Sequence, residues 1–317
     1  MKILVTGSSG FLGRSLVIKS LAHGHQITES RSLKSKNNTE KKFFINLDKN
    51  ADWSDALFNV DLVIHLAARV HVMDENALNP LTEFRNINTE GTLTLAHQAA
   101  SNGVKRFIFI SSIKVNGEFS QDGKPFNEKS HYIPDDPYGL SKYEAEQGLF
   151  KIAEETGMEV VIIRPPLVYG PNVSANFASM MKWVYKGIPL PFGAVDNKRS
   201  LVALDNLVDF IIHCINHPKA ANEIFLISDG EDVSTATLLK KVATAFGQKA
   251  WLLPIPVKWM EFVASLLGKR AVTDRLFTSL QLDSSKARDL LGWKPVITMD
   301  EQLKKTADAY IENEKML

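Results

Sequence analysis

A tyrosine and a lysine four positions apart are the residues of this chain best suited to moving a proton. Tyr138 and Lys142 fall in a predicted helix over residues 137–155, where the i, i+4 spacing puts both side chains on one face. A free phenol titrates at about pH 10, and a neighbouring ammonium favours the phenolate and lowers the phenol's pKa. Ser111 and Ser112 end an apolar run at 107–110, where a hydroxyl can hydrogen-bond a substrate oxygen. These side chains predict acid–base chemistry.

Three glycines spaced G-x-x-G-x-x-G follow the first apolar run and precede the first amphipathic stretch. Glycine permits a tight turn and a close backbone approach, and the following helix N-terminus offers free N–H groups to a pyrophosphate. A purely structural turn is the alternative for the glycines alone, but the strand–loop–helix context favours a dinucleotide. The predicted cofactor contacts in this loop are Gly7, Ser9, Gly10, Phe11, Leu12 and Gly13.

The end of the second predicted strand carries basic residues where dinucleotide-binding proteins usually carry an acid for the adenosine ribose. Arg31, Ser32 and Lys34 follow this strand, and no carboxylate lies between Ser30 and Asn38. A guanidinium, a hydroxyl and an ammonium suit a ribose 2′-phosphate. A solvated basic loop is the alternative. The pattern favours NADP as the cofactor, with NAD as the other possibility.

Short apolar runs alternate with longer amphipathic stretches through the first half of the chain. The predicted strands lie at 3–5, 26–28, 43–45, 62–64, 107–110 and 160–163, and the predicted helices at 11–22, about 78–100 and 137–155. Near-continuous apolar strands separated by helices are typical of a parallel sheet covered on both faces. The predicted fold class is therefore α/β, a doubly wound parallel sheet of Rossmann type with a second, smaller C-terminal substrate lobe.

A change in composition after Arg164, from apolar runs to a proline-rich segment, predicts a domain boundary. Five prolines crowd the segment from Pro165 to Pro191, which suits a lobe folded over the C-terminal edge of the sheet. The stretch 203–227 again has the pattern of a strand and a helix, so we expect the chain to return once to the first domain. The expected division is a dinucleotide-binding domain over 1–165 with a return segment at 196–228, and a substrate lobe over 166–195 and 229–317.

The composition is that of an ordinary globular protein. The 317 residues are 44% hydrophobic and 23% charged, which excludes the disordered and fibrous classes. The net charge of +1 gives no reason to expect nucleic acid or an anionic membrane as a partner. Cys214 is the only cysteine, so no intramolecular disulfide and no thiolate metal cluster can form. With no secretory or membrane-spanning apolar run, we expect a cytoplasmic protein with no membrane insertion and no metal.

These motifs resemble those of the extended short-chain dehydrogenase/reductase family, which contains the nucleotide-sugar epimerases and dehydratases. The resemblance covers nearly the whole chain and extends beyond the glycine loop and the Y-x-x-x-K pattern. The further segments that carry it are His65–Ala68, Asn88–Thr92, Arg164–Pro171, Arg199, Asp205–Leu207 and Leu291–Pro295.

The resemblance implies a role for individual residues. It makes Ser112, Tyr138 and Lys142 the catalytic residues, with Tyr138 and Lys142 also in contact with the cofactor. Further cofactor contacts would be Asn46, Leu47, Asp48, Leu66, Ala67, Ala68, Asn88 and Pro165. The substrate would be a UDP-sugar in contact with Ser112, Lys114, Asn176, Arg199 and Arg275. A homodimer is the assembly that the family leads us to expect.

Departures from the family pattern narrow the expected activity. The 4,6-dehydratases carry an Asp-Glu pair directly after the catalytic hydroxyl residue, where this chain has Ile113 and Lys114. An alkyl chain and an ammonium cannot replace two carboxyl groups in the elimination of water, so 4,6-dehydratase activity is not expected. Leu167 stands where the epimerases usually place a substrate-contacting Asn, and Asn116 stands at the family's usual Tyr.

A subgroup from bacterial surface-polysaccharide pathways is similar to this chain over 71–74, 111–118 and 197–201. That similarity implies an enzyme that reduces a UDP-4-keto-6-deoxy-N-acetylhexosamine at C4 with NADPH. The alternative is a 4-epimerase of UDP-glucose or UDP-N-acetylglucosamine with tightly bound NAD. A third hypothesis is a non-catalytic dinucleotide sensor; such proteins commonly lose the tyrosine or the lysine, and this chain has both.

Overall fold

Seven parallel strands form the main sheet of the protein, in the order β3-β2-β1-β4-β5-β6-β9. The computed structural model describes residues 1–31, 42–70, 79–121, 123–130, 132–266 and 276–315. The strands are β1 (Lys2–Thr6), β2 (Gln26–Arg31), β3 (Lys42–Phe44), β4 (Leu62–His65), β5 (Arg106–Ile110), β6 (Glu159–Arg164) and β9 (Glu223–Leu226). The strand order reverses between β1 and β4, so their carboxyl ends flank the crevice in which open α/β sheets bind ligands.

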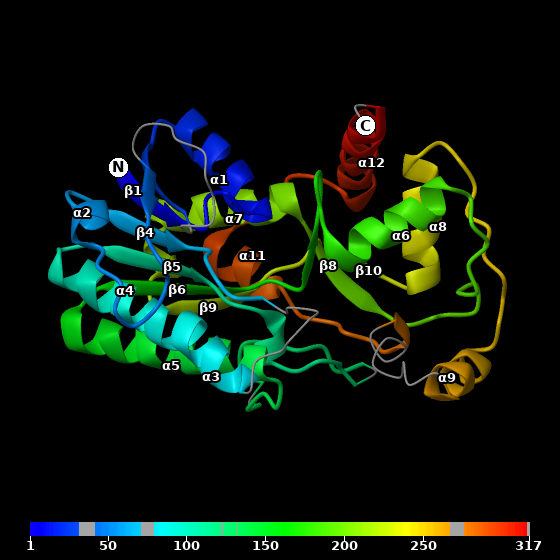
Figure 1. The fold of residues 1–317 in the computed structure, drawn as a ribbon, viewed down its shortest axis with the longest axis horizontal. Coiled ribbons are helices and arrows are strands. Elements are labelled where there is room, and N and C mark those ends of the chain that lie inside the picture. The colour runs from blue at the N-terminus through cyan, green and yellow to red at the C-terminus, as the bar shows by residue number, and fades with distance from the viewer. Residues whose placement is uncertain (32–41, 71–78, 122, 131, 267–275, 316–317) are drawn as a thin grey trace.

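Helices cover both faces of this sheet (Figure 1). One face carries α1 (Phe11–Ala22), α7 (Leu204–Asn216) and α11 (Ser285–Leu291), whose apolar residues share one core cluster with the strands. The other face carries α2 (Ser54–Leu57), α3 (Pro80–Phe84), α4 (Gly91–Ser101) and α5 (Pro137–Thr156). These two layers confirm the predicted doubly wound α/β fold.

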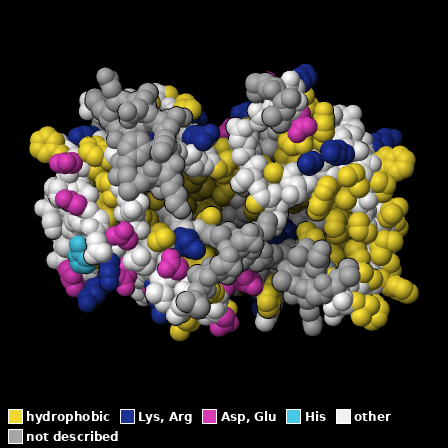
Figure 2. Space-filling view, viewed as in Figure 1, with side chains coloured by type: hydrophobic (Ala, Val, Ile, Leu, Met, Phe, Trp, Pro, Cys, Tyr) yellow, Lys and Arg dark blue, Asp and Glu magenta, His cyan; other side chains and the backbone are white. Residues whose placement is uncertain are grey.

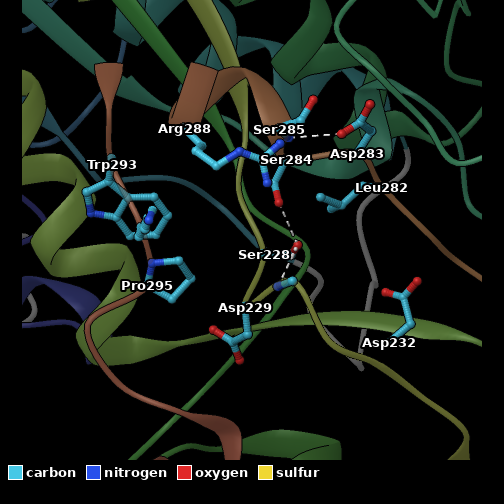
Figure 3. A pocket seen from close by; sticks show the side chains of 12 residues that line it. Ser228, Asp229, Asp232, Leu282, Asp283, Ser284, Ser285, Arg288, Trp293 and Pro295 are labelled. Atoms are coloured by element: carbon cyan, nitrogen blue, oxygen red, sulfur yellow. Dashed lines mark hydrogen bonds between the residues drawn. The ribbon is translucent and has the colours of Figure 1, made fainter. Parts of the chain in front are cut away.

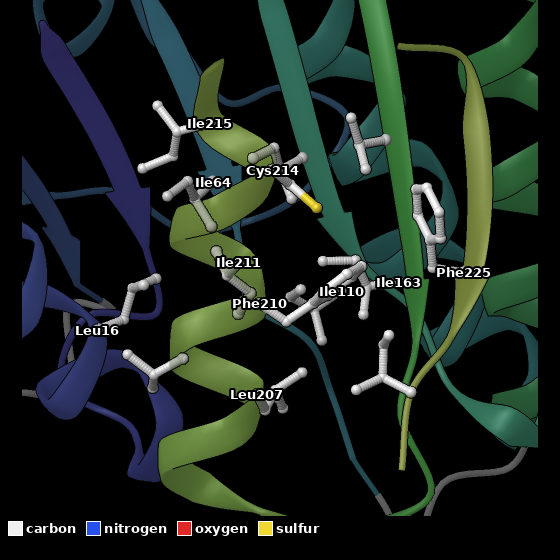
Figure 4. Packing of buried hydrophobic residues seen from close by; sticks show 14 of the residues in the cluster. Leu16, Ile64, Ile110, Ile163, Leu207, Phe210, Ile211, Cys214, Ile215 and Phe225 are labelled. Atoms are coloured by element: carbon white, nitrogen blue, oxygen red, sulfur yellow. The ribbon is translucent and has the colours of Figure 1, made fainter. Parts of the chain in front are cut away.

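The side chains of each strand alternate between the two cores. Ile64 and Ile110 point toward α7 and pack in one cluster with Phe210 and Cys214 of that helix (Figure 4). Val63 faces the layer that contains α4 and α5. Because both faces are buried, the central strands must be apolar at every position, which explains the unbroken runs in the sequence. Burial raises the pKa of the Cys214 thiol, so this cysteine is an inert core residue.

A second, smaller sheet in the order β10-β8-β7 forms the base of the C-terminal lobe. Its strands are β7 (Leu167–Tyr169), β8 (Arg199–Ala203) and β10 (Asp232–Val233). The helices around it are α6 (Ala175–Tyr185), α8 (Thr235–Ala245), α9 (Val257–Leu266) and α12 (Met299–Lys315). The segment 196–228, which we expected to return to the first domain, is divided between the two sheets. Its strand β8 lies in the small sheet, whereas α7 packs against α1 and β9 pairs with β6 of the main sheet.

A six-residue π-turn, η1 (Arg85–Glu90), interrupts the stretch that the sequence pattern predicts as one helix over about 78–100. In the described part of that stretch, α3 precedes the π-turn and α4 follows it. Single π-turns inside helices occur often at functional sites, because they widen the turn and redirect side chains. Here the π-turn brings Asn88 and Thr89 against α5.

The surface of the C-terminal lobe carries exposed apolar side chains, which Figure 2 shows gathered on one end of the molecule. They include Trp251, Trp259 and Phe262, and no residue of the described helix α9 is buried. No helix in the described ranges is both long enough and apolar enough to cross a bilayer.

We predict that Phe210→Ala lowers the free energy of unfolding by about 3–5 kcal/mol. The Phe210 ring is fully buried and packs edge-to-face on Phe225 at 5.4 Å and Trp293 at 5.0 Å, joining α7, β9 and the segment after α11. Urea unfolding followed by circular dichroism measures the change. Ile18→Ala, at a position on α1 that is 70% exposed, is the control and should change the stability little. Equal effects of the two changes would contradict the prediction.

Candidate active site

The glycine turn between β1 and α1 has the close-packed geometry that a dinucleotide requires. Gly7 has a φ of +67°, and a Cβ on Gly13 would lie 2.2 Å from the Gly7 carbonyl oxygen. No side chain in the described residues caps α1 at Gly10, so the first N–H groups of the helix face outward without a side-chain acceptor. An anionic pyrophosphate fits such a helix start. The residues present therefore fit the predicted cofactor.

The segment after β4 lies directly against this turn. A Cβ on Gly7 would lie 2.9 Å from the Ala67 nitrogen, and the Leu66 and Ala67 amides both donate to the Thr6 hydroxyl at 3.2 Å. His65 is fully buried between Thr6 and Thr92, at 2.6 Å and 2.9 Å from their hydroxyls. The structure thus brings the predicted contacts Leu66 and Ala67 beside the predicted phosphate loop.

Tyr138 lies in the first turn of α5, at a helix start that the local sequence determines. Pro137 occupies the first turn, and the Asp136 side chain caps the helix by accepting from the Gly139 amide at 3.0 Å. The Tyr138 phenol is hydrogen-bonded with Ser112, which itself starts the short 3-10 turn η2 (Ile113–Val115) after β5. Two residues that are 26 positions apart in the sequence thus meet at the C-terminal edge of the sheet.

Burial controls the protonation of Tyr138. It raises the pKa of the phenol to about 12, while the hydrogen bond with Ser112 acts in the opposite direction. The sequence pattern predicts instead that Lys142, together with the positive nicotinamide of a bound cofactor, lowers this pKa. The difference arises because the phenol is desolvated, and because the lysine beside it is itself poorly charged at neutral pH. The phenol is therefore a proton donor in the protein without cofactor.

Lys142 lies one helical turn after Tyr138 and is almost fully buried. Its ammonium nitrogen donates to the Ile110 carbonyl at 2.9 Å and lies 4.4 Å from the centre of the Phe109 ring. Burial lowers the pKa of Lys142 to about 7, against the opposing effect of the Glu146 carboxylate. Burial lowers the pKa of His65 to about 3, and the positive charge of Lys142 contributes a smaller effect in the same direction. Lys142 is therefore the titratable cation of the site near pH 7, and His65 is neutral there.

Asn88 joins the π-turn to two other parts of the site. Its side-chain oxygen accepts from the Arg69 amide at 2.8 Å, and its side-chain nitrogen donates to the Arg69 carbonyl and the Ser141 hydroxyl, both at 3.0 Å. The side chain is fully buried. These contacts make Asn88 a brace between the segment after β4 and helix α5.

Arg31 has a partner that the sequence pattern did not suggest. Its guanidinium pairs with Glu29 at 3.0 Å, on the same face of β2, and both side chains are largely buried. The i, i+2 spacing in a strand was the available signal. Ser32 and Lys34 lie outside the described residues. Any 2′-phosphate at Arg31 would therefore meet a carboxylate next to the guanidinium.

The remaining predicted cofactor residues lie around the same edge of the sheet. Asn46, Leu47 and Asp48 follow β3, and a Cβ on Gly91 would lie 2.9 Å from the Leu47 side chain, so this segment packs on the start of α4. Ala68 follows Ala67 after β4. Pro165 follows β6, is buried, and accepts a hydrogen bond from the Ile113 amide at 3.0 Å, next to Ser112.

The predicted substrate residues are spread over both halves of the molecule. The Lys114 ammonium pairs with Glu118 at 3.0 Å and with the capping residue Asp136 at 3.2 Å. Asn176 is exposed in the first turn of α6. Arg199 begins β8, donates to the Thr278 carbonyl at 3.3 Å, and has its pKa lowered by burial. Arg275 lies outside the described residues.

A pocket of about 630 Å³ lies beyond the end of β9, between the residues after this strand and the segment around α11 (Figure 3). Its described lining contains no predicted site residue and includes the carboxylates Asp229, Asp232 and Asp283. Asp229 is structural, because it accepts from the Tyr169 hydroxyl at 2.7 Å and the Asn206 side chain at 2.7 Å. The lining also includes the cations Arg288 and Lys294, so its charge is mixed, and no predicted site residue connects this pocket with the substrate.

Comparison with known proteins identifies the family. A family model described as "NAD dependent epimerase/dehydratase family" matches residues 3–228. The chain belongs to this family. The match covers the glycine turn, both predicted catalytic segments and the return of the chain through α7 and β9. The protein is accordingly an enzyme of the nucleotide-sugar epimerases and dehydratases, as the sequence motifs predict.

The similarity to individual proteins extends over nearly the whole length of this chain. The UDP-glucose 4-epimerase of Vibrio cholerae is 50% identical over 313 residues, which cover 98% of this chain and 95% of that protein. The UDP-glucose 4-epimerase of Thermotoga maritima, solved with UDP-glucose, has a TM-score of 0.77 at 25% identity and covers 99% of this chain and 100% of its own. RMD from Pseudomonas aeruginosa, complexed with NADPH, has a TM-score of 0.73 at 21% identity, with 98% and 99% covered. This is an NAD(P)-binding family.

Two charged residues next to the site, Glu146 and Arg164, were not among the predicted site residues, although Arg164 begins a segment that carries the family resemblance. Glu146 and Arg164 form a buried ion pair next to Ser111, at the carboxyl ends of β5 and β6. The available signals were the spacing of Tyr138, Lys142 and Glu146 at successive turns of one helix face, and an arginine ending an apolar strand.

We predict that Lys142→Met stabilises the protein without cofactor at pH 7, by on the order of 1–4 kcal/mol, because it removes a buried ammonium. The pKa of this lysine is about 7 in the folded state and 10.5 in the unfolded state. Between these values the unfolded chain binds more protons, so the stability of the unaltered protein rises with pH from 7 to 10. The variant should lack this rise.

Urea unfolding at several pH values measures the effect of Lys142→Met. Lys151→Met, at an exposed position of the same helix, is the control and should leave the slope of stability against pH unchanged. A Lys142→Met protein that is less stable at pH 7, with the slope retained, would show that burial of the ammonium is not costly.

Proposed function

We propose that the protein is a UDP-hexose 4-epimerase that uses a bound NAD(P). The observation that carries the proposal is the meeting of Ser112, Tyr138 and Lys142 at the C-terminal edge of β5, beside the segment that packs on the glycine turn. The 50% identity to the Vibrio cholerae enzyme over nearly the full chain supports the choice of reaction. Ile113 and Lys114, in place of two acids, disfavour 4,6-dehydration.

Each residue of the trio has a distinct task in this reaction. Ser112 orients the O4 atom of the sugar by a hydrogen bond, and Tyr138 takes the O4 proton as O4 becomes a carbonyl oxygen and later returns it. The bound nicotinamide would accept the C4 hydride and return it to the opposite face of the sugar. The Lys142 ammonium would bind the cofactor ribose. Together with the positive charge of an oxidised nicotinamide it would lower the pKa of Tyr138 from its high value in the protein without cofactor, so that the phenolate can take the O4 proton.

The C-terminal lobe supplies the proposed binding groups for the nucleotide. Arg199 on β8 and Asn176 on α6 would contact the diphosphate, together with Arg275. Lys114 would approach the sugar only after exchanging one of its two carboxylate partners, since it is paired with both Glu118 and Asp136. These assignments follow the family resemblance. An arginine keeps its charge and its planar set of donors even where burial lowers its pKa, which suits Arg199 to this role.

A second candidate function is the NADPH-dependent reduction of a UDP-4-keto-hexosamine by the same trio. One observation favours it, the guanidinium of Arg31 at the end of β2, where an acid would favour NAD. Hydride would then pass in one direction only, from the reduced cofactor to C4, and Tyr138 would donate its proton to O4. The two candidates differ in whether cofactor is consumed.

The first test is isomerisation without added cofactor. We predict that the purified protein retains NAD(P), interconverts UDP-glucose and UDP-galactose or their N-acetyl forms, and leaves the net amount of reduced cofactor constant. Tyr138→Phe should lower turnover by about 10²–10⁴-fold with the bound cofactor retained. Tyr143→Phe, on the same helix, is the matched control. Consumption of NADPH with a UDP-4-keto sugar, and no isomerisation, would establish the second candidate instead.

The second test concerns the Arg31–Glu29 pair. If Arg31 binds a 2′-phosphate, Arg31→Asp should weaken NADP binding by about 10–100-fold relative to NAD. Glu29→Gln should strengthen NADP binding, because it removes the competing carboxylate. Titration of both cofactors by tryptophan fluorescence measures the ratio. An unchanged ratio in both variants would mean that Arg31 does not select the cofactor.

A further inference from the structure

A buried ion pair with two hydrogen-bonded neighbours lies behind the proposed catalytic residues. The Glu146 carboxylate accepts from the Ser111 hydroxyl at 2.5 Å and from the Arg164 Nε at 3.0 Å, and its other oxygen accepts from a terminal nitrogen of Arg164. Arg164 also donates to the Asn116 side chain at 3.0 Å, and Asn116 donates to the Asn127 carbonyl at 2.9 Å. Glu146 is 0% and Arg164 5% exposed.

This network connects the three chain segments that must hold the trio. Glu146 belongs to α5 and lies on the same helix face as Tyr138 and Lys142, two turns after the tyrosine and one turn after the lysine. Ser111 precedes Ser112, and Arg164 ends β6. Each partner of the carboxylate therefore comes from a different segment, and the two segments also share the bond from the Ser111 amide to the Ile163 carbonyl at 2.8 Å.

The network also determines the electrostatic environment of Lys142. The groups that act on this ammonium are His65 from β4, Glu146 from its own helix, and the Ile110 carbonyl and the Phe109 ring from β5. His65 is neutral near pH 7, and Arg164 from β6 is engaged with Glu146 and Asn116. Glu146 is thus the anion that favours the charged form of Lys142, against its burial.

We propose that Glu146, held by Arg164 and Ser111, is a positioning residue of the active site. It fixes α5 against the Ser111–Ser112 turn, so that the phenol of Tyr138 meets Ser112. It also lies one helical turn after Lys142 on the same helix face, where its charge favours the ammonium. The proposal rests on the proposed function for its catalytic consequence, but its electrostatic part concerns the chain alone. Removing only one partner leaves an uncompensated buried charge, whereas removing both is far less costly.

A second ion pair between the same two strands provides a matched control. Arg106 and Glu159 are register partners at the opposite, amino-terminal ends of β5 and β6. Arg106 is buried and pairs with Glu159 at 2.6 Å, while the Glu159 side chain is 42% exposed and lies far along the strands from the trio. Glu159→Gln thus removes an interstrand arginine–carboxylate pair without touching the site.

The experiment compares Glu146→Gln with Glu159→Gln in the full-length protein. The titration of Lys142 is followed by NMR in protein labelled with ¹³C-lysine and assigned with Lys142→Met. We expect Glu146→Gln to move this titration downward by about one pH unit or more, and Glu159→Gln to leave it unchanged. In turnover assays, Glu146→Gln should lower kcat by about 10-fold at pH 8 and less at pH 6, with KM changed less than kcat.

The double variant Glu146→Gln/Arg164→Met covers the case in which the single variant fails to fold, since it leaves no unpaired charge. It should fold and still show the lowered titration. A titration and a pH profile like those of the unaltered protein, in either folded variant, would overturn the proposal and leave the pair a structural contact. Absence of any C4 activity in the unaltered protein would count against the proposed function alone, because the NMR titration needs no substrate.

Discussion

An ammonium buried away from water is the constraint around which the active site is organised. Lys142 is 1% exposed, and the lost hydration must be offset by the Ile110 carbonyl, the face of Phe109 and the charge of Glu146. The carboxylate is itself buried and in turn requires Arg164 and Ser111. One desolvated cation therefore accounts for a chain of polar groups between α5, β5 and β6, where apolar packing would otherwise be expected.

The same edge of the sheet depends on close backbone approach as much as on charge. Gly7 and Gly13 have no room for a side chain, because the segment after β4 and the turn itself occupy that space. Thr6 and His65 complete the contact by hydrogen bonds that leave both groups satisfied although buried. A phosphate loop and a proton-transfer helix can thus share one crevice, since β1 and β4 are neighbours where the strand order reverses.

Two lines of reasoning about the reaction point in different directions. The relative at 50% identity favours a 4-epimerase, whereas Arg31 favours NADP and with it a reductase. The pairing of Arg31 with Glu29 weakens the second argument, because the carboxylate occupies the guanidinium that a 2′-phosphate would need. The reaction that we propose accordingly follows the similarity over the whole chain. Arg31 bears on which cofactor the protein selects, and not on which reaction it catalyses.

The sequence by itself determined what depends on near neighbours in the chain. The apolar runs, the glycine spacing and the i, i+4 placement of Tyr138 and Lys142 each follow from local periodicity, and with the family motifs they predict the sheet, the phosphate loop and the enzyme class. Only the tertiary structure decided the pairing of Glu146 with Arg164, the place of β8 in the second sheet and the direction of the Tyr138 pKa. Burial and partner choice at these positions depend on residues that are distant in sequence, so local spacing could suggest a candidate such as Glu146 but could not assign its partner.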